Sequence, residues 1–499
     1  MRAAACLTVL VSLWTIMPPA AGSAERRVTF ELRTSEIGNL VYQLDCMAER
    51  AHCTSSVFVD LWKRLGWTKQ DDDALQQWRT LTGRYVQSVS LDGSRQEHLL
   101  ALPDQARTLD LADKLRLAAL GAGDLAQYHN RLELVAQPVD ADKLAHIVER
   151  FLPRFHTFWL SRHGKLIKQG RDLGALLRRR DLLDLCDRAA RLYAADIRSP
   201  YTIQVNLIAL PRNNTHHSNG NQIERQAVIE TEEGERPATR VGVILHEFFH
   251  HLYELSTTDA RDRLIERFAS SADPAALTTY GLLNESVAAA LGNGIVERMV
   301  QPAGQYEQYL KRERSFYDDD AIDRVAKAIL PALEDRLAHG RTLYDEDFVP
   351  EYIRLARVGL GKLVNRPALG LRVMVAAILD PSLEPAFRRL QSAVGPGAVS
   401  PCMGDDPDCR DLLRAHAQAS GVIFLPAKMV SQLGAWEEIL GKQNVARISS
   451  LAHRGSPVIL AAHRSPKSII YIFIGQSDRD FMGLVDAFVR AQSTFTELR

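Results

Sequence analysis

Residues 241–255 read VGVILHEFFHHLYEL, an apolar run with helical periodicity that contains His246, Glu247 and His250. Residues four apart on an α-helix lie one turn above each other, so the two imidazoles can bind one metal ion. Glu247 is rotated by about 100° from His246, which places its carboxylate beside the ion and outside the ligand set. The HExxH pattern therefore predicts a zinc site with Glu247 as general base. The alternative is a core helix with two hydrogen-bonded histidines.

A third ligand must come from outside this helix. Glu254 shares its face, but eight residues of helix place Glu254 about 12 Å from His246 along the axis. Residues 283–292 read LNESVAAALG, where Glu285 shares a helix face with small residues at i+3, i+4 and i+7. Such a face lets a second helix approach closely, so Glu285 is the predicted ligand. A packing face with one incidental Glu is the alternative, and Glu266, in an ordinary amphipathic run, is the weaker candidate ligand.

The sequences HEFFH at 246–250 and NESVAAALG at 284–292 resemble the gluzincin branch of zinc metallopeptidases, of thermolysin and neprilysin type. In that group a Glu on a second helix completes a His₂Glu zinc site. The resemblance implies Zn²⁺ as cofactor and a peptide or protein as substrate. It implies His246, His250 and Glu285 as ligands and Glu247 as base. Several members carry an Asp four residues after the ligand Glu, where this chain has Ala289, so another residue must support the first His.

The resemblance also implies a substrate-binding edge strand and a residue that stabilises the oxyanion. The strand expected at 201–210 or the one at 226–231 would form the edge of a sheet above the metal and pair with an extended peptide. A His or Tyr further along would stabilise the oxyanion. Tyr344 and Tyr352 lie in a suitable interval, and Tyr352 is preferred. Each has an alternative interpretation as an ordinary surface or core tyrosine.

The expected fold class is α+β and mostly helical. A gluzincin-like core, with a small mixed sheet, the HExxH helix and a second Glu-bearing helix, follows an N-terminal helical region and precedes a small C-terminal α/β domain. Residues 212–221 are expected to form a loop, and helical periodicity continues from 350 to 390. The predicted divisions are a signal peptide at 1–24, a helical region at 25–200, a catalytic domain at 201–393, a linker with a cysteine loop at 394–409 and an α/β domain at 410–499.

The first residues have the layout of a secretory signal. Arg2 precedes an apolar stretch at 3–17, which Pro18 and Pro19 end before a run of small residues. This stretch is too short to cross a bilayer comfortably, and no later stretch is long and apolar enough. We expect an exported chain, periplasmic or secreted, with no integral membrane span after signal removal.

Cysteine spacing agrees with export. Cys46 and Cys53 are seven positions apart, as are Cys402 and Cys409, and each pair is predicted to close a small disulfide loop. Cys186 lies in an amphipathic helical run and is predicted to be a buried free thiol. Zinc binding by these cysteines is the rival interpretation, but neither pair has CxxC spacing.

The composition does not indicate a nucleic-acid partner, because Lys plus Arg and Asp plus Glu each total 61 and the net charge is zero. The main hypothesis is an exported zinc-dependent hydrolase, most simply a metallopeptidase. The alternative is an exported helical binding or assembly protein whose metalloprotease-like core is inactive or structural. An intact Glu247 favours the enzyme, since an inactive core has no need of that carboxylate beside two histidines.

Overall fold

The computed structural model describes residues 28–49, 53, 55–85, 101–107, 109–211, 219–395, 397–404, 407–465 and 467–498. The signal peptide expected at 1–24 lies outside these residues. The described chain is a mixture of helices and two small sheets, which confirms an α+β architecture with much helix. None of its helices is both long enough and apolar enough to cross a membrane.

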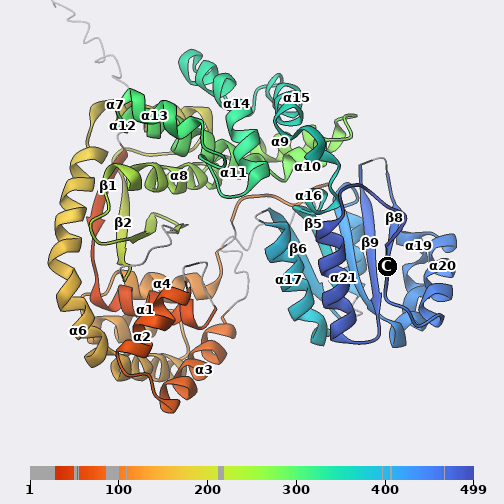
Figure 1. Ribbon diagram of the computed structural model, residues 1–499, viewed down its shortest axis with the longest axis horizontal. Helices are drawn as coiled ribbons and strands as arrows, with labels where there is room; N and C mark the ends of the chain where they lie inside the picture. The colour runs from red at the N-terminus through yellow and green to blue at the C-terminus, as the bar shows by residue number, and fades with distance from the viewer. Residues whose placement is uncertain are drawn as a thin grey trace, which may run out of the picture.

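A four-stranded sheet forms the centre of the first part of the chain (Figure 1). Its order is β1 (Val28–Arg33), β2 (Tyr201–Ala209), β4 (Gln226–Thr231) and β3 (Gly220–Ile223). β1, β2 and β4 are parallel, and β3 is antiparallel to β4. Because Val28 pairs with Tyr201, the regions predicted as 25–200 and 201–393 share one sheet, and the boundary expected at 200 does not separate two folding units.

The edge strand differs from the expected one. β2 and β4 are both inner strands, and β3 forms the edge beside them. The loop expected at 212–221 therefore gives way to a strand at Gly220. The four residues of β3 read GNQI, a sequence too short and too polar to show strand alternation.

Helices surround this sheet. The 40-residue helix α6 runs along it and contacts β1, β2 and α8 (Figure 1). The helices before β2 are α1 (Glu36–Met47), α2 (Ser55–Arg64), α3 (Lys69–Gly83), α4 (Leu111–Leu120), α5 (Leu125–Leu132), α6 (Pro138–Leu177) and α7 (Arg180–Leu192). Those after β4 are α8 (Ala238–Glu254), α9 (Thr258–Ser270), α10 (Ala276–Tyr280), α11 (Leu283–Ala289), the π-helix η1 (Ala290–Val296), α12 (Glu297–Val300), α13 (Ala303–Leu310), α14 (Asp320–His339), α15 (Phe348–Leu360), the 3₁₀-helix η2 (Gly361–Asn365) and α16 (Pro367–Gly370).

A second sheet of six strands forms the C-terminal part, in the order β10, β8, β9, β7, β5, β6 (Figure 1). β5, β6, β7 and β9 are parallel, while β8 and β10 are antiparallel to their neighbours. The strands are β5 (Val373–Ile378), β6 (Ala398–Met403), β7 (Ser420–Pro426), β8 (Val458–His463), β9 (Ile469–Gly475) and β10 (Glu497–Leu498). The helices are η3 (Pro381–Leu383), α17 (Glu384–Val394), α18 (Pro407–Ala415), η4 (Ala427–Trp436), α19 (Glu437–Leu440), α20 (Lys442–His453) and α21 (Asp478–Arg490).

This sheet corrects the predicted C-terminal boundaries. The helix expected through 350–390 is interrupted by β5, whose sequence VMVAAI is buried at every position and so has no periodicity to read. The linker expected at 394–409 contains β6, an edge strand in which Pro401 is tolerated. The α/β unit therefore begins at β5 and not at residue 410.

The cysteines pair as predicted. Cys46 is bonded to Cys53 and Cys402 to Cys409. Cys186 is free and buried on α7.

Candidate metal centre

Two helices bring three predicted ligands together. His246 and His250 lie one turn apart on α8, and Glu285 lies in the first turn of α11. The Nε2 atoms of the two histidines are 3.0 Å apart. Glu285 Oε2 is 3.6 Å from His246 Nε2 and 3.4 Å from His250 Nε2. One atom from each residue thus faces a common point, with all three atoms within 4.8 Å of one another.

Glycines permit this close approach. A Cβ atom on Gly292, in η1, would lie 2.8 Å from His246 Cβ and 2.9 Å from the Gly242 carbonyl oxygen of α8. A side chain at 292 would therefore force the two helices apart. The small-residue face predicted around Glu285 packs against the HExxH helix, as its composition indicates. It continues into a π-helical turn, a feature frequent at functional sites.

The donor atoms fit a zinc ion. Glu285 Oε2 is buried, and no hydrogen-bond partner for it exists among the described residues. A buried carboxylate oxygen without a partner is costly, and a cation held by two imidazoles and one carboxylate would satisfy it. Asn284 orients the His250 ring from the side opposite the cluster, because its amide oxygen lies 3.1 Å from His250 Nδ1. That contact is of the kind that fixes the tautomer of a metal-binding histidine.

Charges within the cluster favour a cation. Burial acts to lower the pKa of His250, but the Glu285 carboxylate outweighs it and raises this pKa to about 9. Burial acts to raise the pKa of Glu285, but His250 and His246 together outweigh it through charge and hydrogen bonding, so that this pKa lies well below its ordinary value. The site therefore contains an ionised carboxylate whose charge a protonated His250 balances, and a bound cation would replace that proton.

Glu247 lies beside this cluster and faces the edge strand. A Cβ atom on Gly220 would lie 2.9 Å from both Cγ and Oε1 of Glu247, so β3 passes directly along this carboxylate. Burial raises the pKa of Glu247 more than His246 and His250 lower it. The carboxylate is thus placed to exchange a proton with a group bound between the cluster and β3.

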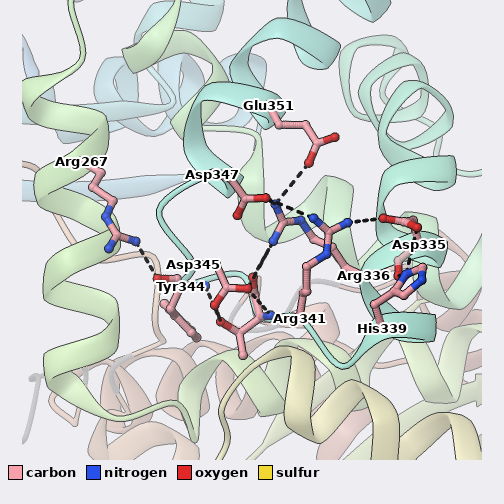
Figure 2. A network of polar contacts seen from close by, with 10 residues as sticks. Arg267, Asp335, Arg336, His339, Arg341, Tyr344, Asp345, Asp347 and Glu351 are labelled. Atoms are coloured by element: carbon pink, nitrogen blue, oxygen red, sulfur yellow. Dashed lines mark hydrogen bonds and ion pairs between the residues drawn. The ribbon is translucent and has the colours of Figure 1, made fainter.

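The structure does not bring Tyr352 to the cluster. It is 1% exposed, and its hydroxyl donates to the Thr279 carbonyl at 3.1 Å and lies 3.0 Å from Ser286 Oγ. Tyr352 therefore packs against α11 through Ser286 and has a structural role. Tyr344, the other tyrosine considered, belongs to the polar network around Arg336 that Figure 2 shows. Its carbonyl accepts from Arg267 at 2.6 Å, and its hydroxyl donates to Ser256 at 2.6 Å.

A different tyrosine lies at the site. The ring of Tyr317 stacks on the His246 imidazole, with centroids 5.8 Å apart. Burial, followed by the charges of Glu285 and Glu247, raises its pKa above the ordinary value. The η1 helix fixes its position, because Asn293 Nδ2 donates to the neighbouring Phe316 carbonyl at 2.5 Å. Tyr317 lies in the α13–α14 connection, and its sequence surroundings carry no motif that sets it apart.

His251 has a structural role. It is 4% exposed, with Nε2 at 2.6 Å from the Tyr201 hydroxyl and Nδ1 at 3.1 Å from the Glu254 carboxylate. Tyr201 of β2 and Glu254 of α8 thus hold the ring away from the three-residue cluster. The sequence also contains His216 and His217, which lie outside the described residues.

Comparison with models of protein families, with curated proteins and with solved structures finds no match to this chain. The site is therefore interpreted from its own residues. These are His246, His250 and Glu285 as a possible ligand set, Glu247 beside it, and Gly220 and Tyr317 as neighbours that the sequence did not reveal.

Proposed function

We propose that this chain is a zinc-dependent hydrolase that cleaves peptide bonds. The observation that carries the proposal is the convergence of His246, His250 and Glu285 from two helices, with Glu247 next to them and outside the ligand set. A His₂Glu set is typical of catalytic zinc, because it leaves a coordination position open. Zn²⁺ bound there would supply a Lewis acid that activates water and polarises the scissile carbonyl.

The chain's own residues supply the remaining chemistry. Glu247 accepts the proton of the attacking water and delivers it to the leaving amine. The Tyr317 hydroxyl is the candidate donor to the oxyanion, in place of Tyr352, because its ring stacks against His246. Asn284 holds the His250 ring in its orientation.

The edge strand supports a peptide substrate. β3 is the edge strand beside Glu247, and an extended peptide can add to an edge strand through main-chain hydrogen bonds. The absence of a side chain at Gly220 lets β3 lie directly against the Glu247 carboxylate. A short antiparallel edge strand, the HExxH helix and a second Glu-bearing helix support the proposal of a gluzincin-like core.

The proposed location is outside the cytoplasm. Two disulfides in the described chain require an oxidising compartment to form and persist. This agrees with the signal-like sequence at 1–24, and the periplasm or the extracellular space both satisfy it.

Zinc content tests the ligand assignment. We expect the purified chain to hold one equivalent of zinc and Glu285→Ala to lose it. Glu266→Ala is the matched control, because Glu266 lies on α9, outside the cluster, and its replacement should leave zinc content unchanged. Loss of zinc in Glu266→Ala but not in Glu285→Ala would refute the assignment.

A further inference from the structure

Residues 101–107, here called the strap, contact both α10 and Asn284 on one side of the proposed site and β3 on the other. On one wall, the Tyr280 hydroxyl donates to the Pro103 carbonyl at 2.8 Å. Gln105 Oε1 accepts from the backbone N–H of Asn284 at 3.1 Å. The strap is therefore fixed to α10 and to the residue that precedes the ligand Glu285.

On the other wall, the strap is fixed to the edge strand. Arg107 Nη1 donates to the Gln222 carbonyl at 2.7 Å and to the Asn221 side chain at 2.6 Å. Its Nη2 donates to Asp113, at the start of α4, at 2.5 Å. The Cα atoms of Gln105 and Arg107 are at most about 7 Å apart, since consecutive Cα atoms are 3.8 Å apart. The strap thus ties the ligand helix to β3 over a very short span.

The register of β3 shows which of its backbone groups Arg107 occupies. Glu230 N–H donates to the Asn219 carbonyl at 3.0 Å, so Asn219 faces β4. Backbone groups alternate along a strand, so those of Gly220 and Gln222 face away from β4, toward the open edge. Arg107 donates a hydrogen bond to the outward-facing carbonyl oxygen of Gln222. Gly220, beside Glu247, is then the position at which an added peptide can pair.

We infer that the strap blocks the edge of β3 beyond Gln222, so that the enzyme removes short pieces from one end of a peptide chain and does not cut within it. This inference rests on the proposed peptidase function. Gly220 and Gln222 are about 7 Å apart at roughly 3.3 Å per strand residue, which leaves room for about one to three substrate residues before the strap. The substrate class is thus a peptide with a free end.

Product analysis of a matched peptide set tests this inference. The probe is one linear peptide of about a dozen residues, together with its acetylated, amidated and head-to-tail cyclised forms. We expect mass spectrometry to find loss of about one to three residues from a single end of the linear peptide, on the spacing argument above. One of the two end-blocked forms should react poorly, and the cyclic form should not be cut.

The Arg107→Ala variant extends the test, because it frees the Gln222 carbonyl. Each main-chain hydrogen bond gained by a longer substrate changes binding by about fivefold, so internal cleavage should rise by at least that factor relative to terminal cleavage. Arg131→Ala, an exposed arginine on α5, is the matched control and should keep the wild-type products.

Two results separate the ways in which the idea can fail. Internal or cyclic-peptide cleavage by the wild-type chain overturns the strap inference and leaves the peptidase function intact. No cleavage of any peptide by the zinc-loaded chain overturns the proposed function and the inference together. The wild-type measurements decide the question even if Arg107→Ala does not fold.

Discussion

Replacement of Gly292 by alanine isolates the helix contact on which the cluster depends. The new Cβ would lie 2.8 Å from His246 Cβ and 2.9 Å from both His246 Cα and the Gly242 carbonyl oxygen. Carbon contacts are stable at about 3.5–4.0 Å, so α8 and η1 must separate by about 0.7 Å or more. None of the three atoms belongs to a flexible side-chain end. The separation must therefore move the backbone that carries the ligands.

Two magnitudes follow from this displacement. Overpacking of this kind costs about 1–3 kcal/mol of folding stability, against a gain of up to about 1 kcal/mol for Gly→Ala in a helix. Zinc sites tolerate distance errors of only about 0.2 Å, so the separation should also weaken zinc binding by at least about tenfold. We therefore expect Gly292→Ala to lose more zinc affinity than its loss of stability alone would suggest.

The assay combines urea unfolding with competitive zinc titration. Gly304→Ala on α13 is the matched control, because a Cβ there meets no atom within 4 Å. This control should be as stable as wild type or slightly more stable, with unchanged zinc affinity. If Gly292→Ala behaves like Gly304→Ala in both measurements, close α8–η1 packing does not assemble the site.

Three further predictions concern single side chains. Tyr317→Phe should lower kcat by about 10²- to 10³-fold with zinc retained. Tyr352→Phe, the control, should affect stability only and keep kcat near the wild-type value. Equal kcat values for the two variants would exclude Tyr317 from the mechanism. Gly220→Ala should displace the Glu247 side chain, because the new Cβ would lie 2.9 Å from its Cγ and Oε1, and should therefore lower peptide hydrolysis with zinc content unchanged; hydrolysis at the wild-type rate would argue against a Glu247 carboxylate held against β3. Burial raises the pKa of Glu297 from its ordinary 4.5 to about 7, so the folded protein binds this proton more tightly than the unfolded chain does. The free energy of unfolding should therefore fall as pH rises from about 4.5 to about 7. In urea unfolding, Glu297→Gln should reduce this dependence on pH, and an unchanged dependence would exclude the Glu297 carboxyl as its source.

The convergence of His246, His250 and Glu285 was predictable because its sequence signals are local. His246 and His250 are related by one helical turn, and Glu285 is marked by the small residues that follow it on the same face. The disulfides were predictable for the same reason, since Cys46–Cys53 and Cys402–Cys409 each close a short loop. In each case the residues that interact are close in sequence or share one helix face.

Features that depend on tertiary contacts escaped prediction. Tyr317 reaches His246 only because Asn293 and the α13–α14 connection place it there, and nothing near it in sequence signals that role. Arg107 reaches β3 across more than a hundred residues of chain. β5 was assigned to helix because a strand buried on both faces has no alternation.

Glu247→Gln is the most direct test of the central claim, because Glu247 lies beside the cluster without being one of its ligands. The amide has nearly the shape of the carboxylate but cannot accept the proton of the attacking water. We predict unchanged zinc content and a fall in peptide hydrolysis of about 10²–10⁴-fold, the usual loss when a general base is removed. Hydrolysis by the zinc-loaded variant at the wild-type rate would contradict the account.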